Sequence, residues 1–160
     1  MGVASAVICA KAGANVSLVG RSLEKAEKIA GICNDRYNSK NVKGGADADK
    51  SDFFNAADIV LNTGAAGIQL MSEEHIKNSN TLKICADTNA VPPSGIAGVD
   101  VMDNGKVIDM SPSKCLGIGA LAIGNIKYKS QHECLKLMYT SEKPVYLDFE
   151  DAFKFAQKSV

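Results

Sequence analysis

The first part of the chain alternates between two spacings of apolar residues. Residues 2–12 are small and apolar and are followed by Gly13, which predicts a buried helix that ends at a glycine. Residues 23–37 carry apolar side chains at helical spacing behind Ser22, which predicts an amphipathic helix capped by that serine. The short apolar run 15–19 between them predicts a buried strand.

The alternation of strands and helices continues to the end of the chain. We expect strands at residues 43–48, 58–61 and 81–86, helices at 51–56, 72–77 and 120–139, a hairpin at Asn104-Gly105 and a last helix from an Asp148 cap to about residue 158. Ser51 is expected to cap the first of these helices. This order predicts an α/β fold, here a Rossmann-like, doubly wound and mostly parallel sheet with helices on both faces.

Three loops would follow the carboxyl ends of parallel strands, where such sheets bind ligands. They are residues 20–21, 62–66 and 87–98. The small residues of NTGAAG, from position 62, would let a cofactor approach the backbone amides. The last loop is too rich in Pro and Gly for regular structure, and its Ile and Val content argues against disorder, so a functional loop is expected.

The tip of the strand at residues 15–19 indicates which dinucleotide would bind. An NAD-binding unit carries an acidic residue there, which accepts the ribose 2′-hydroxyl. This chain has Arg21, Ser22 and, one helical turn later, Lys25, which can pair with the oxygens of a 2′-phosphate and therefore predict NADP. The alternative is that both cations simply face water, although a helix N-terminus disfavours cations unless an anion binds there.

Composition excludes several classes of function. The chain has 160 residues with 46% apolar content, enough for one domain with a normal core. Its 18 basic and 18 acidic residues balance, so no global field attracts nucleic acid or an anionic membrane. The five cysteines lack metal-binding spacing and indicate reduced, mostly buried thiols of a cytoplasmic protein. We expect no metal site, signal peptide or transmembrane segment.

Four segments, in order along the chain, carry a family resemblance. They are VGRSLEKAEKIA (19–30), NTGAAGIQL (62–70), ADTNAVPPSGIAGVD (86–100) and GALAIGNIKYK (119–129). Together they resemble the NADP-binding domain of the methylene-tetrahydromethanopterin dehydrogenases. That family oxidises the methylene group carried by tetrahydromethanopterin, or in some members by tetrahydrofolate, to the methenyl form and reduces NADP. The resemblance implies an oxidoreductase of one-carbon metabolism with a reduced pterin as its substrate.

The resemblance also implies which positions would contact the cofactor. It matches Gly2 to the last glycine of the nucleotide-binding fingerprint and Arg21, Ser22 and Lys25 to contacts with the 2′-phosphate. It places Thr63, Gly64 and Ala65 in the loop past the ribose and nicotinamide, Asp87 and Asn89 in the loop flanking the nicotinamide, and Gly119 and Ala120 in the turn on its far side. Two alternatives remain open, because Asp87 could brace its own loop and Gly119 could serve packing.

Members of the family carry an N-terminal domain that contributes most of the pterin site, followed by a first strand and two fingerprint glycines. We therefore expect residues 1–160 to be a partial, N-terminally truncated NADP-binding domain without that strand. No catalytic residue is expected, because the nitrogens flanking the methylene carbon stabilise the cation that hydride loss leaves. The remaining chemistry-bearing side chains are expected to be incidental: His75, His132 and the pair Tyr139 and Lys143, which has short-chain dehydrogenase spacing.

Two other interpretations stay open. Another NADP enzyme, of a shikimate dehydrogenase-like or folate-specific methylene dehydrogenase type, would share the Arg21 turn, but the loop at 87–100 argues against it. A non-catalytic or regulatory NADP-binding module would fit a chain that acts without a further domain. The sequence leaves open the pterin carrier, any cyclohydrolase activity and a homo-oligomeric state.

Overall fold

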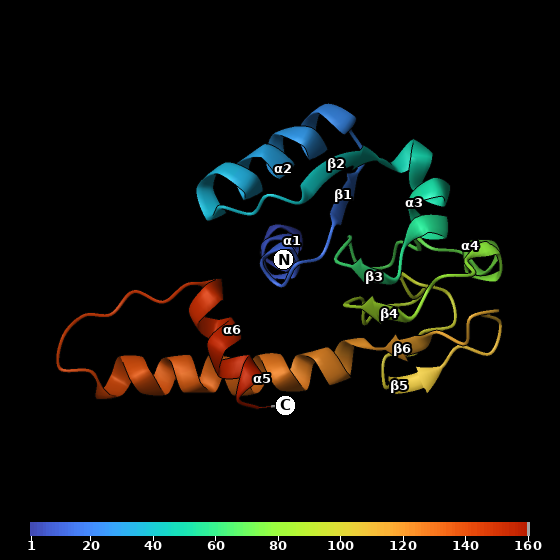
Figure 1. Cartoon of the computed structure of the whole chain (residues 1–160). Coiled ribbons are helices and arrows are strands. Elements are labelled where there is room, and N and C mark those ends of the chain that lie inside the picture. Colours follow the sequence, from blue (N-terminus) through green and yellow to red (C-terminus); the bar gives the residue numbers. More distant parts are fainter. Residues whose placement is uncertain (160) are drawn as a thin grey trace.

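The computed structural model describes residues 1–159 and confirms an α/β fold (Figure 1). The helices are α1 (Gly2–Lys11), α2 (Leu23–Tyr37), α3 (Lys50–Ala56), α4 (Glu73–Asn78), α5 (Ala120–Thr140) and α6 (Phe149–Gln157), with a short 3-10 turn η1 (Asp47–Asp49) before α3. The strands are β1 (Val16–Gly20), β2 (Val42–Ala46), β3 (Ile59–Asn62), β4 (Ile84–Asp87), β5 (Asn104–Val107) and β6 (Leu116–Ile118).

The strands form two sheets in the described part of the chain. β1 pairs with β2 in parallel, and the second sheet has the order β3-β4-β6-β5, in which β5 alone is antiparallel to its neighbour. The mostly parallel character is therefore confirmed. β1 and β3 belong to different sheets, so a single continuous doubly wound sheet, and the absent first strand, stay predictions.

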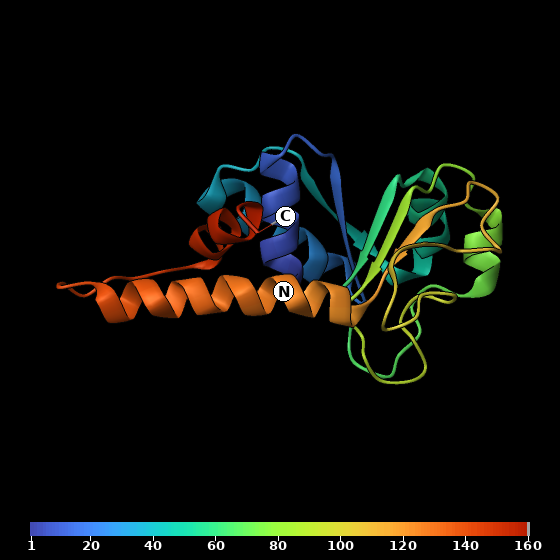
Figure 2. The same cartoon turned by 90° about the horizontal axis from the view of Figure 1, so that it is seen from below.

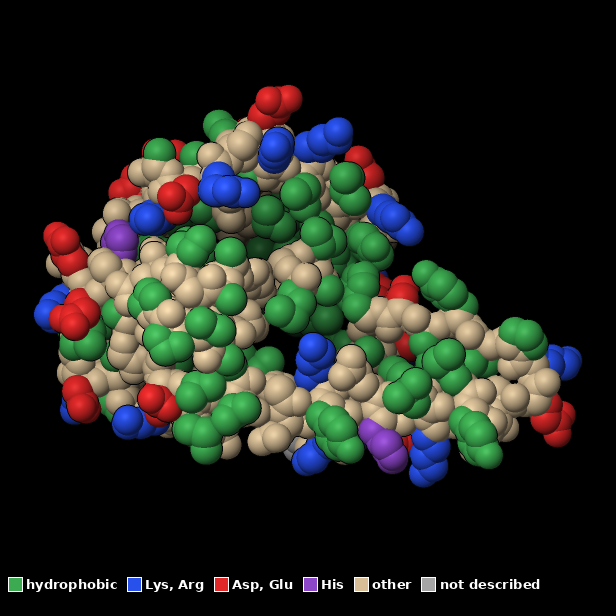
Figure 3. Space-filling model, turned by 180° about the vertical axis from the view of Figure 1, so that it is seen from behind, with side chains coloured by type: hydrophobic (Ala, Val, Ile, Leu, Met, Phe, Trp, Pro, Cys, Tyr) green, Lys and Arg blue, Asp and Glu red, His purple; other side chains and the backbone are tan. Residues whose placement is uncertain are grey.

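Apolar side chains are exposed on β1 and β3, which are edge strands of their sheets. Val19 on β1 is 38% exposed, and Ile59 and Leu61 on β3 are 53% and 43% exposed. Figure 3 shows hydrophobic side chains gathered around a hollow above α5. Edge strands are normally covered or paired, and the exposed Val19, Ile59 and Leu61 give these two edges an apolar surface.

Each sheet has its own hydrophobic core. Beside β1 and β2, side chains of α1 and α2 pack together with Val42 of β2: Ala6, Val7, Ala10, Ala30 and Cys33. Beside the second sheet, the core contains Met71, Ile76, Leu82, Cys85, Ile96, Val99, Ile108 and Cys115. All five cysteines are free, as expected. Burial, together with the neighbouring Cys115 thiol 4.0 Å away, holds the pKa of Cys85 well above its usual range.

Several helix ends lie where the capping residues in the sequence predict them. α2 begins directly after Ser22, whose hydroxyl accepts from the Lys25 amide, and Gly13 follows α1 with a φ of +94°, which a glycine adopts without strain. Asp148 caps α6 through two backbone amides. The expected Ser51 cap is wrong, because η1 runs directly into α3 and leaves Ser51 inside the first turn.

The expected hairpin turn at Asn104-Gly105 is also wrong. These residues begin β5, and the φ of +81° at Gly105 belongs to a bulge between Asn104 and Lys106 opposite β6. An Asn-Gly pair supplies the positive φ that either a tight turn or a bulge needs, so the local signal has two solutions. The connection that reverses the chain is instead the segment between β5 and β6, where Lys114 has a φ of +53°.

Of the two C-terminal helices, α6 packs against α1 and α2 beside the first sheet, and α5 packs against α6. Figure 2 shows α5 extending away from the two sheets, with α6 folded back towards α1. Lys11 of α1 forms an ion pair with Glu150 of α6, and the Tyr37 and Phe149 rings lie 5.3 Å apart. Within residues 1–159, no helix has the length and apolar character needed to cross a membrane.

Candidate cofactor site

The segments predicted to bind a dinucleotide all follow the carboxyl ends of parallel strands. The chain leaves β1 at Gly20, β3 at Asn62, β4 at Asp87 and β6 at Ile118. Figure 2 shows the loops after these strands gathered at one edge, beside the start of α5. Gly2, at the start of α1, lies at the same edge, since a Cβ added to it would lie 3.1 Å from Thr63 Oγ1.

A cationic cavity lies at the end of β1. Its lining combines the predicted residues Arg21, Ser22 and Lys25 with apolar side chains and encloses about 520 Å³: Leu18, Gly20, Ala26 and Ile29 complete it. Arg21 and Lys25 are exposed, and among residues 1–159 neither takes part in an ion pair. The structure therefore brings these three predicted residues together around one hollow.

Backbone geometry adds to the positive charge of this cavity. The cavity lies at the N-terminus of α2, where unpaired backbone amides and the helix dipole favour an anion. Ser22 accepts a hydrogen bond from the Lys25 amide at 3.4 Å, which fixes the first turn of the helix. The apolar wall formed by Leu18 and Ile29 gives the other side of the hollow a surface that a flat ring can cover.

A buried polar network joins the ends of β3 and β4. The carboxylate of Asp87 is 1% exposed and accepts from Asn62 Nδ2 at 2.7 Å, from the Asn89 amide at 2.9 Å and from the Ile96 amide at 3.0 Å. The Asn62 side-chain oxygen accepts from the Gly64 amide at 2.9 Å. Asp87 therefore braces its own loop, which was one of the two roles that the sequence left open.

Asn89 extends this network to the neighbouring loop. Its side-chain oxygen accepts from the amides of Gly67 at 3.3 Å and Val91 at 3.0 Å, and its Nδ2 donates to Pro93 O at 2.9 Å. With all these bonds made inside the protein, Asn89 is only 7% exposed. The side chain consequently shapes the loops, while the backbone of the exposed Gly64 is what the site presents to solvent.

The start of α5 packs closely against the backbone of residues 100–103. A Cβ on Gly119 would lie 2.1 Å from Asp100 O and 2.6 Å from Val101 O, so only glycine fits at this position. The Gly119 amide donates to Asp103 O at 2.8 Å. The packing role that the sequence left open for Gly119 is therefore present in the structure, and Ala120 next to it is half-buried at the first turn of α5.

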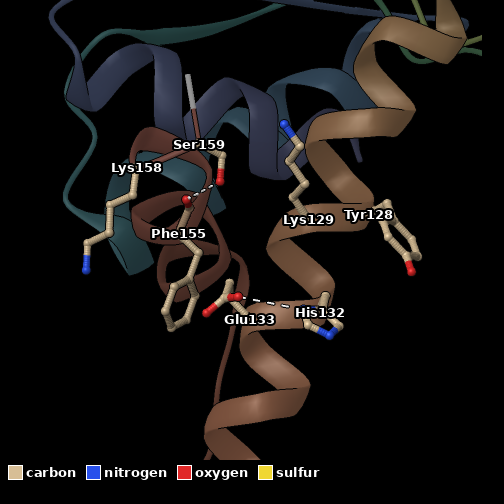
Figure 4. Close-up of a pocket in the computed structure, with 7 residues that line it drawn as sticks. All are labelled: Tyr128, Lys129, His132, Glu133, Phe155, Lys158 and Ser159. Atoms are coloured by element: carbon tan, nitrogen blue, oxygen red, sulfur yellow. Dashed lines mark hydrogen bonds and ion pairs between the residues drawn. The ribbon is translucent and has the colours of Figure 1, made fainter.

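A second hollow, of about 420 Å³, lies between α5 and α6 (Figure 4). It was not predicted, and Figure 4 shows Tyr128 and Lys158 pointing away from its centre. His132 lies 3.6 Å from the carboxylate of Glu133. Tyr139, further along α5, is 92% exposed.

His75 takes part in the cap of α4. Its Nδ1 lies 3.0 Å from the Ser72 hydroxyl in the cap of α4, and its ring packs against Phe54 at a centroid distance of 5.1 Å. Across residues 1–159 there is no group of three or more His, Cys, Asp or Glu side chains that could hold a metal ion.

Comparison with curated proteins gives two close matches. The chain is 37% identical over 155 residues to NAD(P)-dependent methylenetetrahydromethanopterin dehydrogenase of Methylorubrum extorquens, which covers 95% of this chain and 52% of that protein. The chain is a relative of the methylene-tetrahydromethanopterin dehydrogenases. It is also 34% identical over 148 residues to the bifunctional protein MdtA of the same organism, covering 91% of this chain and 50% of that protein. No family model matches the chain.

These matches confirm the family resemblance read from the four segments. The chain spans about half the length of the curated methylene-tetrahydromethanopterin dehydrogenase relatives that it matches. The roles assigned to individual cofactor-binding positions stay predictions. Sequence reasoning missed Asn62 as a functional candidate, although it opens the NTGAAG segment and its side chain joins two of the predicted loops.

Proposed function

We propose that the chain binds NADP, with the adenosine 2′-phosphate in the cavity at the end of β1. The observation that carries this proposal is that Arg21, Ser22 and Lys25 line one hollow at a helix N-terminus, with neither cation in an ion pair among residues 1–159. Exposed cations without an acidic partner retain their full capacity for a phosphate. The apolar Leu18 and Ile29 supply a surface for the adenine ring.

The rest of the dinucleotide would lie along the edge formed by the ends of β3, β4 and β6. This direction leads from the Arg21 cavity past Gly2 and Thr63 to the loops at Gly64 and Asn89. The small residues there support a close approach, because a glycine at position 64 adds no side chain between the loop backbone and a ligand. The proposed nicotinamide end is the end nearest to α5.

We further propose that a longer protein containing this domain is an NADP-dependent methylene-tetrahydromethanopterin or methylene-tetrahydrofolate dehydrogenase. The substrate would be the reduced pterin, and most of its site would lie outside residues 1–160. When bound, NADP supplies the carbon that accepts the hydride. The residues of this chain would orient the dinucleotide and exclude water, and they supply neither an acid nor a base, because the reaction requires no proton transfer at the methylene carbon.

The family relation and the free cysteines support a cytoplasmic enzyme of one-carbon metabolism. A non-catalytic NADP-binding module remains the competing proposal. It predicts nucleotide binding without pterin oxidation in any longer form of the protein. Measuring NADP-dependent oxidation of methylene-tetrahydromethanopterin and methylene-tetrahydrofolate by such a form separates the two.

The binding proposal is tested by NADPH titration of the chain, followed by nucleotide fluorescence. Arg21→Ala should weaken NADPH binding about 30-fold, because a charge-assisted hydrogen bond contributes about 2 kcal/mol. Lys28→Ala is the matched control, since Lys28 is an exposed cation one turn further along α2 and lies outside the cavity. Equal affinities of Arg21→Ala and the unchanged chain would contradict the proposal.

A further inference from the structure

Asn62 connects two loops that the sequence leaves separate. Its Nδ2 donates to Asp87 at the end of β4, and its Oδ1 accepts from the Gly64 amide in the loop after β3. Its backbone carbonyl accepts from both the amide and the hydroxyl of Thr88, at 3.2 and 3.0 Å. One residue therefore bonds to both loops through its side chain and its backbone.

The pair formed by Asn62 and Asp87 is closed off from water. The two residues face each other in the β3–β4 register and are 4% and 1% exposed. Gly95 covers them, since a Cβ added there would lie 1.8 Å from Asn62 Nδ2 and 2.9 Å from Asp87 Oδ1. The backbone of the second loop is thus placed directly against this pair.

The chemistry of the amide side chain suits this position. The same group must donate to a carboxylate and accept from a backbone amide, and Asn provides both at the required short length. A carboxylate at position 62 would instead face Asp87 at hydrogen-bond distance and repel it. An apolar residue would leave the Gly64 amide without its acceptor and would remove one of the two hydrogen bonds that Asp87 Oδ1 accepts.

We infer that Asn62 is a positioning residue for the nicotinamide end of NADP, an inference that rests on the proposed function. It holds the Gly64 amide on one side of that end and, through Asp87, the Ile96 amide and its loop on the other. It touches no part of the cofactor's 2′-phosphate site, which lies at the end of β1. Loss of Asn62 should therefore affect one end of the dinucleotide and spare the other.

Two ligands of different length test this separation. NADPH reaches both ends of the site, whereas 2′,5′-ADP reaches the Arg21 cavity alone. Asn62→Ala should weaken NADPH binding about tenfold, the equivalent of about one lost hydrogen bond, and change 2′,5′-ADP binding less than about twofold. Arg21→Ala should weaken both ligands. Asn55→Ala, an exposed asparagine on α3, is the matched control and should change neither.

Exchanging the two side chains provides a rescue experiment. Asn62→Asp alone places two carboxylates together and should weaken NADPH binding more than Asn62→Ala does. Adding Asp87→Asn restores one amide and one carboxylate, and should recover a large part of the NADPH affinity, with the Asn89 amide left unpaired. A double variant that binds NADPH no better than Asn62→Asp would overturn the inference.

A measurement on the unchanged chain covers variants that fail to fold. NADPH should slow hydrogen exchange in residues 63–67 and 88–96 together, while 2′,5′-ADP should slow exchange only around residues 20–25. Protection of one loop without the other, or equal protection of both loops by the two ligands, would overturn the inference. If the unchanged chain binds 2′,5′-ADP and NADPH and Asn62→Ala binds both normally, only this inference fails; a chain that binds neither ligand overturns the proposed function as well.

Discussion

The ends of β1 and β4 both carry polar side chains predicted to serve a cofactor, but these side chains differ in exposure and in hydrogen bonding. Arg21 and Lys25, after β1, are exposed, and within residues 1–159 neither is engaged in an ion pair. Asp87, at the end of β4, is 1% exposed and accepts three hydrogen bonds from the protein. Arg21 and Lys25 therefore remain able to bind a ligand, whereas the carboxylate of Asp87 is already hydrogen-bonded to the loops.

This difference separates residues that can bind a ligand from residues that stabilise the conformation of the loops. An exposed cation contributes little to folding and can contribute strongly to the binding of a phosphate. A buried carboxylate that is fully hydrogen-bonded determines which backbone conformation is stable. Substitutions at the end of β1 should therefore change affinity, and substitutions around Asp87 should first change the free energy of unfolding.

The largest expected effect is at Asp87. Asp87→Ala removes the acceptor for three buried donors and should lower the free energy of unfolding by about 3 kcal/mol. Asp109→Ala removes an exposed carboxylate and should change it by less than about 0.5 kcal/mol. Urea unfolding followed by circular dichroism measures both variants. Equal stabilities would show that the network does not support the loops.

A smaller effect is expected from closing the space above the network. Gly95→Ala places a Cβ 1.8 Å from Asn62 Nδ2 and should cost about 2 kcal/mol, because the covering backbone must move away. Gly124→Ala, within α5, meets nothing within 4 Å and should stabilise the chain by up to about 1 kcal/mol. Thermal melts of the two variants should shift in opposite directions. A shift in the same direction would contradict the close packing at Gly95.

The smallest expected effect on stability is at the β1 end. Ser22→Ala removes the cap of α2 and should cost about 0.5 to 1 kcal/mol, together with a few-fold loss of NADPH affinity. Ser51→Ala is the control, because Ser51 lies within the first turn of α3 and makes no cap. A loss of stability in Ser51→Ala equal to that in Ser22→Ala would indicate that Ser51 does cap α3, as the sequence predicts.

Much of the region at the end of β1 and the start of α2 could be predicted, because the residues that determine it are close together in the sequence. The bounds of α2 follow from Ser22 and the apolar spacing, and Arg21 and Lys25 lie within one helical turn of that cap. Nothing distant in the sequence competes for these residues. The same local rules were wrong at Ser51 and at Asn104-Gly105, where the preceding η1 turn and the pairing with β6 decide the structure.

The second region could not be predicted in the same way. The hydrogen bond from Asn62 to Asp87 joins residues 25 positions apart and exists because β3 and β4 pair in one particular register. Neither residue type nor spacing reveals that register. The family resemblance pointed to Asp87 and Asn89, but their bracing of the loops became visible only in three dimensions.

The ratio of NADPH to NADH affinity in the unchanged chain tests most directly whether the Arg21 cavity binds the 2′-phosphate. The two nucleotides differ only by the 2′-phosphate, so the ratio reports on the Arg21 cavity alone. NADPH should bind at least about tenfold more tightly than NADH at moderate ionic strength, because a charge-assisted contact is worth about 1.5 kcal/mol or more. Equal affinities, or tighter binding of NADH, would show that the Arg21 cavity does not bind the 2′-phosphate.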